Sequence, residues 1–334
     1  MANISSLFVH KAIAQASPIL DRDELFEIVG LDASEPASPE QMVTEENYYD
    51  LFEMLASAEK GKIDFHIRTG ASIRCEDMGA LGLAWKSSPT IRNGFERASR
   101  YVRLLVQPQR FEVVNYKDQV GIVHRRTHYV ESLGAYLTHE VAFVTTVSIC
   151  RDAGDFHFTP REVRYSHGGV GDHEALEAFF GCPVHFGANR DEMMVGLDQV
   201  DRTTKVGDAN IFQFFDNYLS AELSRTQDHA QLERQVREQV SNALSGGVPK
   251  LTDVAAGLNM SGRTLQRRLS NEGLAYQKLV DDSRRELAER LLESTAMSLA
   301  EVAFLTGFSE QSAFTRAFKR WYGQTPREFR FDLH

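Results

Sequence analysis

The chain has 334 residues, of which 42% are hydrophobic and 25% charged, the composition of a globular protein with room for two or three domains. No apolar run is long enough to span a bilayer, no signal-peptide layout opens the chain, and three widely spaced cysteines do not suit a disulfide framework, so we expect a cytoplasmic protein without membrane contact. The net charge of −10 is uneven, because residues 1–239 hold 24 Lys/Arg against 36 Asp/Glu and residues 240–334 hold 13 against 11.

Residues 1–205 mix helical and strand periodicity, which predicts an α+β domain. Amphipathic or small-residue spacing predicts helices at about residues 7–29, 45–58, 78–88, 91–105, 136–151 and 173–181. Alternating apolar residues predict a hairpin of residues 111–116 and 120–126, followed by strands at 156–166, 183–187 and 192–199.

Residues 206–230 are predicted to form a linker or dimerisation helix. Asp208–Leu223 places apolar side chains on one side of a helix: Ile211, Phe212, Phe215, Tyr218 and Leu219. Such a stripe can pack against its own domain or against a second copy of the chain, and the sequence leaves both interpretations open. The polar run Ser224–His229 is expected to be a hinge.

Residues 231–334 are predicted to be entirely helical, beginning with a helix over Gln231–Leu244. Residues 251–273 contain two short helices separated at Asn259-Met260, and Ser261 is expected to cap the second. Residues 299–323 repeat this plan, with a turn at Gly307-Phe308 and a cap at Ser309. The side chains expected in the core of the two units are Leu265, Leu269, Phe308, Phe314 and Phe318.

The two helix pairs have the form of helix-turn-helix units, in which the second helix enters the DNA major groove. Residues 276–294 between them predict a helix about 27 Å long. It would hold the two recognition helices roughly one DNA turn, about 34 Å, apart. Arg suits guanine and Gln suits adenine. The residues expected to contact DNA are Arg263, Gln266, Arg267, Arg268, Gln311, Ser312, Thr315, Arg316, Lys319 and Arg320.

At these residues the chain resembles the AraC/XylS family of bacterial transcription regulators. The resemblance is most specific over Gly307–Arg330 and includes both helix pairs and the connecting helix. It implies that the base-reading positions are Arg263, Gln266 and Arg267 in the first unit and Gln311, Ser312, Ala313 and Arg316 in the second. Ala313 offers only apolar contact, for example to a thymine methyl group.

The first 205 residues resemble the arabinose-binding-like sensor domain found in a subset of this family, and not its cupin arm. The matching segments are Leu81–Leu105, Phe156–His167 and Phe179–Thr204. The resemblance implies a small-molecule effector; a fatty acid pairing with an Arg and a basic amino acid suiting the acidic domain both remain open. The candidate effector-binding residues are Trp85, Arg103, Tyr116, Arg126, Tyr165 and Phe186.

The resemblance also implies promoter DNA and RNA polymerase as partners, and we expect a homodimer that acts as an activator. The alternative is a ligand-independent, dimeric repressor or architectural protein. The sequence shows no catalytic constellation, and we expect no enzyme activity, cofactor or metal. His124 and His128 lack an intervening Glu, the glycine-rich run His167–His173 lacks the Lys of a phosphate loop, and His157, His167 and His185 are expected to be ordinary surface or core histidines.

Overall fold

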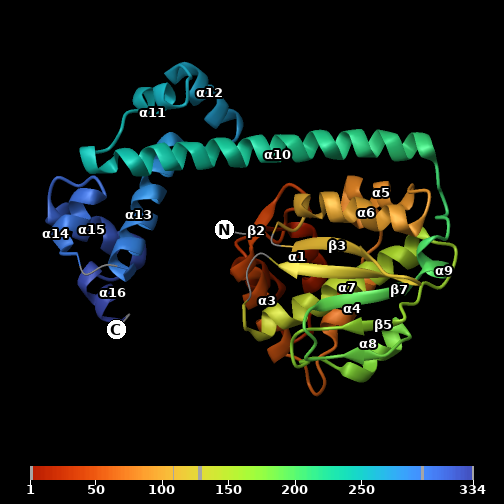
Figure 1. Ribbon diagram of the computed structural model, residues 1–334. Coiled ribbons are helices and arrows are strands. Elements are labelled where there is room, and N and C mark those ends of the chain that lie inside the picture. Colours follow the sequence, from red (N-terminus) through yellow and green to blue (C-terminus); the bar gives the residue numbers. More distant parts are fainter. Residues whose placement is uncertain (1–2, 108, 127–129, 295–296, 333–334) are drawn as a thin grey trace. The chain divides into compact units, whose positions relative to one another are not determined.

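A computed structural model of the chain describes residues 3–107, 109–126, 130–294 and 297–332 (Figure 1). The chain forms two compact units that divide after Leu223. The N-terminal unit is α+β and the C-terminal unit is helical, as predicted.

The main sheet of the N-terminal unit has five strands in the order β3-β4-β7-β5-β6. The predicted hairpin is confirmed, since β3 and β4 pair antiparallel from Gln109↔Arg126 to Asn115↔Val120. Strand β5 is shorter than predicted, because Pro160 has no N–H to donate to a ladder. The strands are β3 (Gln109–Asn115), β4 (Gln119–Arg126), β5 (Glu162–Arg164), β6 (Val184–His185) and β7 (Asp191–Gly196), and a separate pair joins β1 (Asn3–Ser5) to β2 (Met42–Thr44).

Nine α-helices precede α10 in the described part of this unit. The sequence did not predict the short helix α4, and it assigned to a strand the residues of α9, which follow directly after Gly196. The helices are α1 (Ser6–Ile13), α2 (Arg22–Ile28), α3 (Glu45–Ser57), α4 (Phe65–Ser72), α5 (Gly79–Lys86), α6 (Ile91–Tyr101), α7 (Leu133–Ala153), α8 (His173–Phe180) and α9 (Leu197–Val200).

Helix α7 is the centre of the N-terminal core. It has 21 residues and the length and hydropathy of a membrane span, but 83% of its most apolar window is buried inside the unit. Close helix packing depends on glycine here: a Cβ on Gly134 would lie 2.2 Å from the carbonyl oxygen of Tyr49, and one on Gly70 would lie 2.6 Å from Val144 Cγ1. Helices α3 and α4 therefore pack tightly against α7.

Helix α10 (Ala209–Ala243) is continuous over 35 residues, so the predicted hinge at Ser224–His229 is wrong. That run is polar but contains no Gly or Pro to end a helix. The side chains of the predicted apolar stripe differ in their exposure to solvent. Phe212, Phe215 and Leu219 are at least partly buried, whereas the adjacent face exposes Ile211, Phe214 and Tyr218 by 41%, 65% and 47%.

The C-terminal unit has two small hydrophobic cores. The end of α10 joins the first core through Leu232, Val236 and Val240. Ser261 caps its helix as predicted, but the second cap is Glu310 and not Ser309. The helices are α11 (Leu251–Gly257), α12 (Gly262–Asn271), α13 (Tyr276–Ser294), α14 (Leu299–Leu305), α15 (Gln311–Tyr322) and α16 (Pro326–Asp332).

The three thiols lie in the N-terminal unit, and burial raises the pKa of each. Cys75 and Cys150 are buried, and the pKa of Cys182 rises to about 11. A thiol with a raised pKa holds little of the reactive thiolate at neutral pH. These cysteines therefore suit packing better than redox chemistry.

A cluster of buried polar side chains lies beside α7. Glu140 is fully buried, with His66 Nε2 2.7 Å from its Oε2 and His167 Nε2 3.7 Å from its Oε1. His167 Nδ1 accepts a hydrogen bond from the Gly169 N–H, so the proton of the neutral ring is on Nε2. The glycine-rich run closes over this cluster, since a Cβ on Gly171 would lie 2.5 Å from His66 Cε1.

Burial lowers the pKa of His167 from 6.5 to about 4, which predicts acid sensitivity. Between these two pH values the unfolded chain binds more protons at this position than the folded chain, so stability falls as the pH falls. We expect denaturant unfolding to show a loss of about 2 kcal/mol between pH 7 and pH 4.5 that His167→Gln removes.

The matched control is His157→Gln, because His157 is exposed. Other titratable groups surround His167, namely His66, His139, Glu140, His173 and Asp191. An unchanged pH dependence in His167→Gln would assign the acid sensitivity to those groups.

Candidate nucleic-acid interface and effector cavity

Helix α12 presents a basic face to solvent. Leu265 and Leu269 are fully buried, which fixes the rotation of the helix about its axis. The four predicted DNA-contacting side chains of this unit are all exposed: Arg263, Gln266, Arg267 and Arg268.

Helix α15 is arranged in the same way around Phe314 and Phe318, both fully buried. Its outward side chains Gln311, Ser312, Arg316, Lys319 and Arg320 are exposed, while Ala313 and Thr315 are half-buried. Two of the polar groups are already engaged. Thr315 Oγ1 donates to the Gln311 carbonyl oxygen at 3.0 Å, and Ser312 Oγ donates to Glu310 Oε2 at 3.2 Å.

The cations of the C-terminal unit fall into two groups. Arg284 lies over the Phe308 ring and donates to the Thr306 carbonyl oxygen, and Arg237 pairs with Glu233, Asp282 and Glu286. Both arginines stabilise the fold. In the part of the chain that the structure describes, no hydrogen bond or ion pair engages the cations on the outer faces of α12 and α15: Arg263, Arg267, Arg268, Arg316, Lys319 and Arg320.

Helix α13 connects the two helix-turn-helix units. It has 19 residues, about 28 Å at the rise of an α-helix. Leu279 and Val280 belong to the first core, and Ala288 and Leu292 to the second. Each recognition helix is therefore packed against a core that includes part of this connector.

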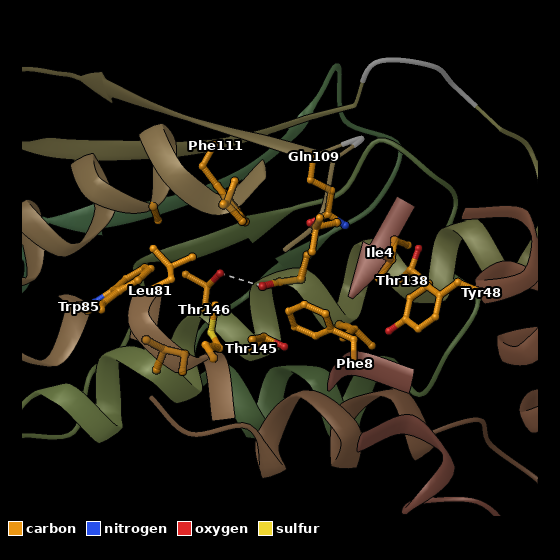
Figure 2. Close-up of a pocket in the computed structure, with 17 residues that line it drawn as sticks. Ile4, Phe8, Tyr48, Leu81, Trp85, Gln109, Phe111, Thr138, Thr145 and Thr146 are labelled. Carbon is orange, nitrogen blue, oxygen red and sulfur yellow. Dashed lines mark hydrogen bonds between the residues drawn. The ribbon is translucent and has the colours of Figure 1, made fainter. Parts of the chain in front are cut away.

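A narrow cavity of about 60 Å³ lies within the N-terminal unit (Figure 2). Side chains from β1, α1, α3, α5, α6, α7 and β3 line it, including Phe8, Trp85, Phe111 and Thr145. None of the described residues that line it is charged.

The predicted effector residues do not form one site. Of the five whose side chains the structure describes, Trp85 alone lines the cavity. Tyr165 is fully buried in an aromatic cluster, stacked on Phe186 at 5.6 Å. Arg103 is half-buried and lines neither the cavity nor the surface hollow that Tyr116 and Phe186 border. The side chain of Arg126 lies outside the described residues.

The surface hollow at Tyr116 is less suited to a ligand, because its polar groups bind one another. Arg190 Nη2 donates to the Tyr116 hydroxyl at 2.6 Å and to Glu192 Oε1 at 2.8 Å, and the Tyr116 hydroxyl donates to the same carboxylate oxygen at 2.9 Å. A polar ligand would have to displace these contacts. The enclosed cavity is therefore the better candidate for an effector site.

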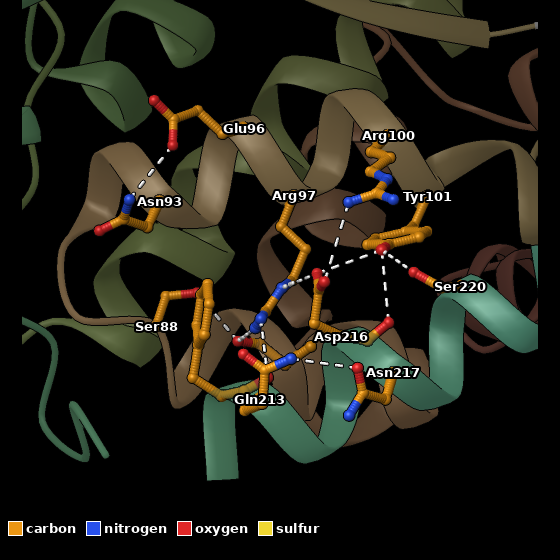
Figure 3. A network of polar contacts seen from close by, with 12 residues as sticks. Ser88, Asn93, Glu96, Arg97, Arg100, Tyr101, Gln213, Asp216, Asn217 and Ser220 are labelled. Atoms are coloured by element: carbon orange, nitrogen blue, oxygen red, sulfur yellow. Dashed lines mark hydrogen bonds and ion pairs between the residues drawn. The ribbon is translucent and has the colours of Figure 1, made fainter. Parts of the chain in front are cut away.

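Helix α6 joins the cavity to the start of α10 (Figure 3). The Arg97 guanidinium lies 3.6 Å from the centre of the Phe212 ring and donates to the Phe212 carbonyl oxygen at 2.9 Å. The Tyr101 hydroxyl shares hydrogen bonds with Ser220 Oγ at 2.6 Å and Asp216 Oδ1 at 3.1 Å. Ala98, one residue beyond Arg97, lines the cavity.

Sequence reasoning missed most of the cavity lining. Its residues come from segments as distant as Ile4 and Ile149, and no local pattern connects them. Thr145 and Thr146 in the largely apolar run Val141–Cys150 of α7 were the available signal, because a buried hydroxyl in a core helix needs a hydrogen-bond partner.

Comparison with known proteins identifies both units. Residues 20–203 match the family model described as the arabinose-binding domain of AraC transcription regulator, N-terminal, and residues 254–331 match a model described as a helix-turn-helix domain. With the exposed recognition helices, these matches define a DNA-binding transcription regulator with a separate N-terminal sensor-type domain. The chain belongs to the AraC family of transcription regulators.

Several proteins similar to this chain are named transcriptional regulators. The transcriptional regulator VqsM of Pseudomonas aeruginosa is 27% identical over 286 residues, which cover 80% of this chain and 84% of VqsM. The regulator VirS of Mycobacterium tuberculosis is 31% identical over 199 residues, 58% of this chain and 56% of VirS. The crystal structure of CdpR from Pseudomonas aeruginosa aligns with 97% of this chain and 98% of that chain, at 21% identity and a TM-score of 0.44.

Replacing the exposed cations of α12 and α15 is expected to have distinct effects on DNA binding. Arg267→Ala, which removes a predicted base contact, should cost about 1–3 kcal/mol at the cognate site and relax specificity there. Lys319→Ala, which removes a predicted phosphate contact, should weaken cognate and scrambled duplexes alike and reduce the salt dependence. Fluorescence anisotropy titrations over a range of salt concentrations measure both effects.

Arg234→Ala is the control, because Arg234 is exposed on α10 outside the predicted interface. It should bind both duplexes as the unmodified chain does. Equal losses on cognate and scrambled DNA for Arg267→Ala would rule out its role in reading bases.

Proposed function

We propose that the chain is an effector-responsive activator that works as a homodimer in the cytoplasm and reads two successive major grooves of promoter DNA. The observation that carries the proposal is the double role of α6. One helix lines the cavity and also holds the start of α10, and α10 continues without a break into the first core of the DNA-binding unit.

A ligand can change a regulator only if it binds two arrangements with unequal affinity. Occupation of the cavity acts on Ala98 and Val102, which lie next to Arg97 and Tyr101. Those two residues hold α10 through Phe212, Asp216 and Ser220. A shift of α6 therefore changes how α10 is held, and α10 carries the change to the DNA-binding unit.

The proposed sign of regulation is activation, through contact with RNA polymerase. Two similar proteins are named transcriptional activators: NphR of a Rhodococcus species, 32% identical over 111 residues, and PerA of Escherichia coli, 32% identical over 80 residues. Both matches cover a third of this chain or less.

The variant Tyr101→Phe tests the coupling. It removes the hydroxyl that contacts Asp216 and Ser220 but keeps the buried ring. After genome-wide mapping of bound sites, we expect affinity for a mapped promoter to stay within about twofold, while transcription from that promoter changes severalfold. Unaltered transcription, or a parallel loss of DNA binding, would contradict the role of this contact.

The proposed dimer uses the exposed side of α10. Ile211, Phe214 and Tyr218 are spaced at i, i+3 and i+7 and are 41%, 65% and 47% exposed. This is the spacing of a helix that packs against another helix. A second copy of the same stripe would bury these side chains in a symmetric contact.

Phe214→Glu should convert the dimer into a monomer, because it would bury a carboxylate in the proposed contact. Sedimentation velocity measures the change. Phe331→Glu is the matched control, since Phe331 is 83% exposed and belongs to a different helix, α16. If both variants remain dimeric, the interface lies elsewhere.

A further inference from the structure

The residues that line the cavity of the N-terminal unit favour an uncharged ligand. Its lining is mostly apolar, and the lining residues with polar side-chain atoms are neutral among those described: Tyr48, Trp85, Gln109, Thr138, Thr145 and Thr146. Arg97 and Arg103 are sequence neighbours of the lining residues Ala98 and Val102, but neither arginine lines the cavity. Arg97 donates to the carbonyl oxygens of Ala84 and Phe212, and Arg103 is not part of the lining.

We infer that the cavity binds a small, uncharged, mostly apolar molecule with one polar group, such as an aliphatic alcohol, aldehyde or ester. This inference rests on the proposed role of the cavity as the effector site. A carboxylate or an ammonium group would be buried here without an opposite charge, which is strongly unfavourable. The charged fatty acid and basic amino acid suggested by the sequence therefore fit the cavity poorly.

The position of the polar group follows from three threonines of α7. Thr138 donates to the Ala135 carbonyl oxygen at 2.8 Å, and Thr146 donates to the Ala142 carbonyl oxygen at 2.7 Å. The Thr145 hydroxyl has no hydrogen-bond partner among the described residues, although the residue is only 8% exposed. Figure 2 shows Thr145 beside Phe8 at the cavity.

A buried hydroxyl without a partner destabilises the protein until something satisfies it. A single carbonyl or hydroxyl group on a ligand would pair with Thr145, while the rest of the molecule contacts apolar side chains. A sugar needs a partner for each of several hydroxyls, and two of the three threonines already bind their own helix. The lining thus does not suit a sugar, despite the name of the family model.

The volume of the cavity limits the size of the ligand. At about 60 Å³ it is smaller than the roughly 150 Å³ that holds benzene in an engineered protein cavity. A ligand of several carbon atoms therefore enters only if the walls of the cavity move. The ligand class is defined by charge and by one hydrogen bond.

The test is thermal unfolding of the full chain with four probes at equal concentration: 1-hexanol, hexanoate, hexylammonium and L-arabinose. We expect 1-hexanol to raise the Tm of the N-terminal transition by about 2–4 °C at saturation, and the other three probes to leave it unchanged. Ala142→Leu, which fills the cavity from α7, serves as the reference because non-specific effects of an alcohol persist in it.

Two matched variants test the hydrogen bond. Thr145→Val and Thr146→Val make the same change at neighbouring lining positions of one helix, but only Thr145 has a hydroxyl available to a ligand. We expect the shift with 1-hexanol to be lost in Thr145→Val and retained in Thr146→Val. The reverse order, or equal effects, would overturn the role of Thr145.

The outcomes separate this inference from the proposed function. A Tm increase with hexanoate, hexylammonium or L-arabinose that Ala142→Leu abolishes would overturn the ligand class but keep the cavity as the effector site. Equal shifts in the unmodified chain and Ala142→Leu for every probe would remove the cavity as a binding site and, with it, the proposed effector response. DNA binding by α12 and α15 does not depend on either result.

Discussion

The contact between α6 and the beginning of α10 is the interaction on which the proposed regulatory mechanism depends. A buried arginine joins the two helices by stacking on Phe212 and by donating to its carbonyl oxygen, and Tyr101 adds hydrogen bonds one turn later. Because α10 contributes apolar residues to both the N-terminal core and the first C-terminal core, this contact lies at one end of an uninterrupted covalent and helical path. Loss of the contact would remove the link from the cavity to α10.

The C-terminal unit shows why the number of basic residues says little about DNA binding. Its net charge is close to zero, and some of its arginines serve the fold, as Arg237 does in its pairing with three carboxylates. What distinguishes the predicted interface is that its cations are exposed and form no hydrogen bond or ion pair with the residues that the structure describes. Such groups retain their full charge for phosphates and bases, so a small net charge is compatible with strong local attraction.

The sequence predicted well those features that depend on local periodicity. The rotation of α12 and α15 followed from the spacing of Leu265, Leu269, Phe314 and Phe318, so the exposure of the predicted DNA-contacting residues could be anticipated. The hinge was wrong because polarity alone does not end a helix. The effector residues were scattered because a cavity is made by packing between distant segments, and Thr145 can be recognised as unpaired only when the hydrogen bonds of α7 are known.

The burial of α7 determines which parts of the N-terminal unit can move when a ligand enters the cavity. A helix buried over most of its length, with the backbone of Tyr49 directly against Gly134, cannot move closer to α3. A guest larger than the cavity must therefore displace other walls, which are formed in part by α5 and α6. Helix α6 carries the attachment of α10, so displacement of this wall reaches α10. The close packing of α7 thus converts the size of a bound molecule into a displacement of the helix that holds α10.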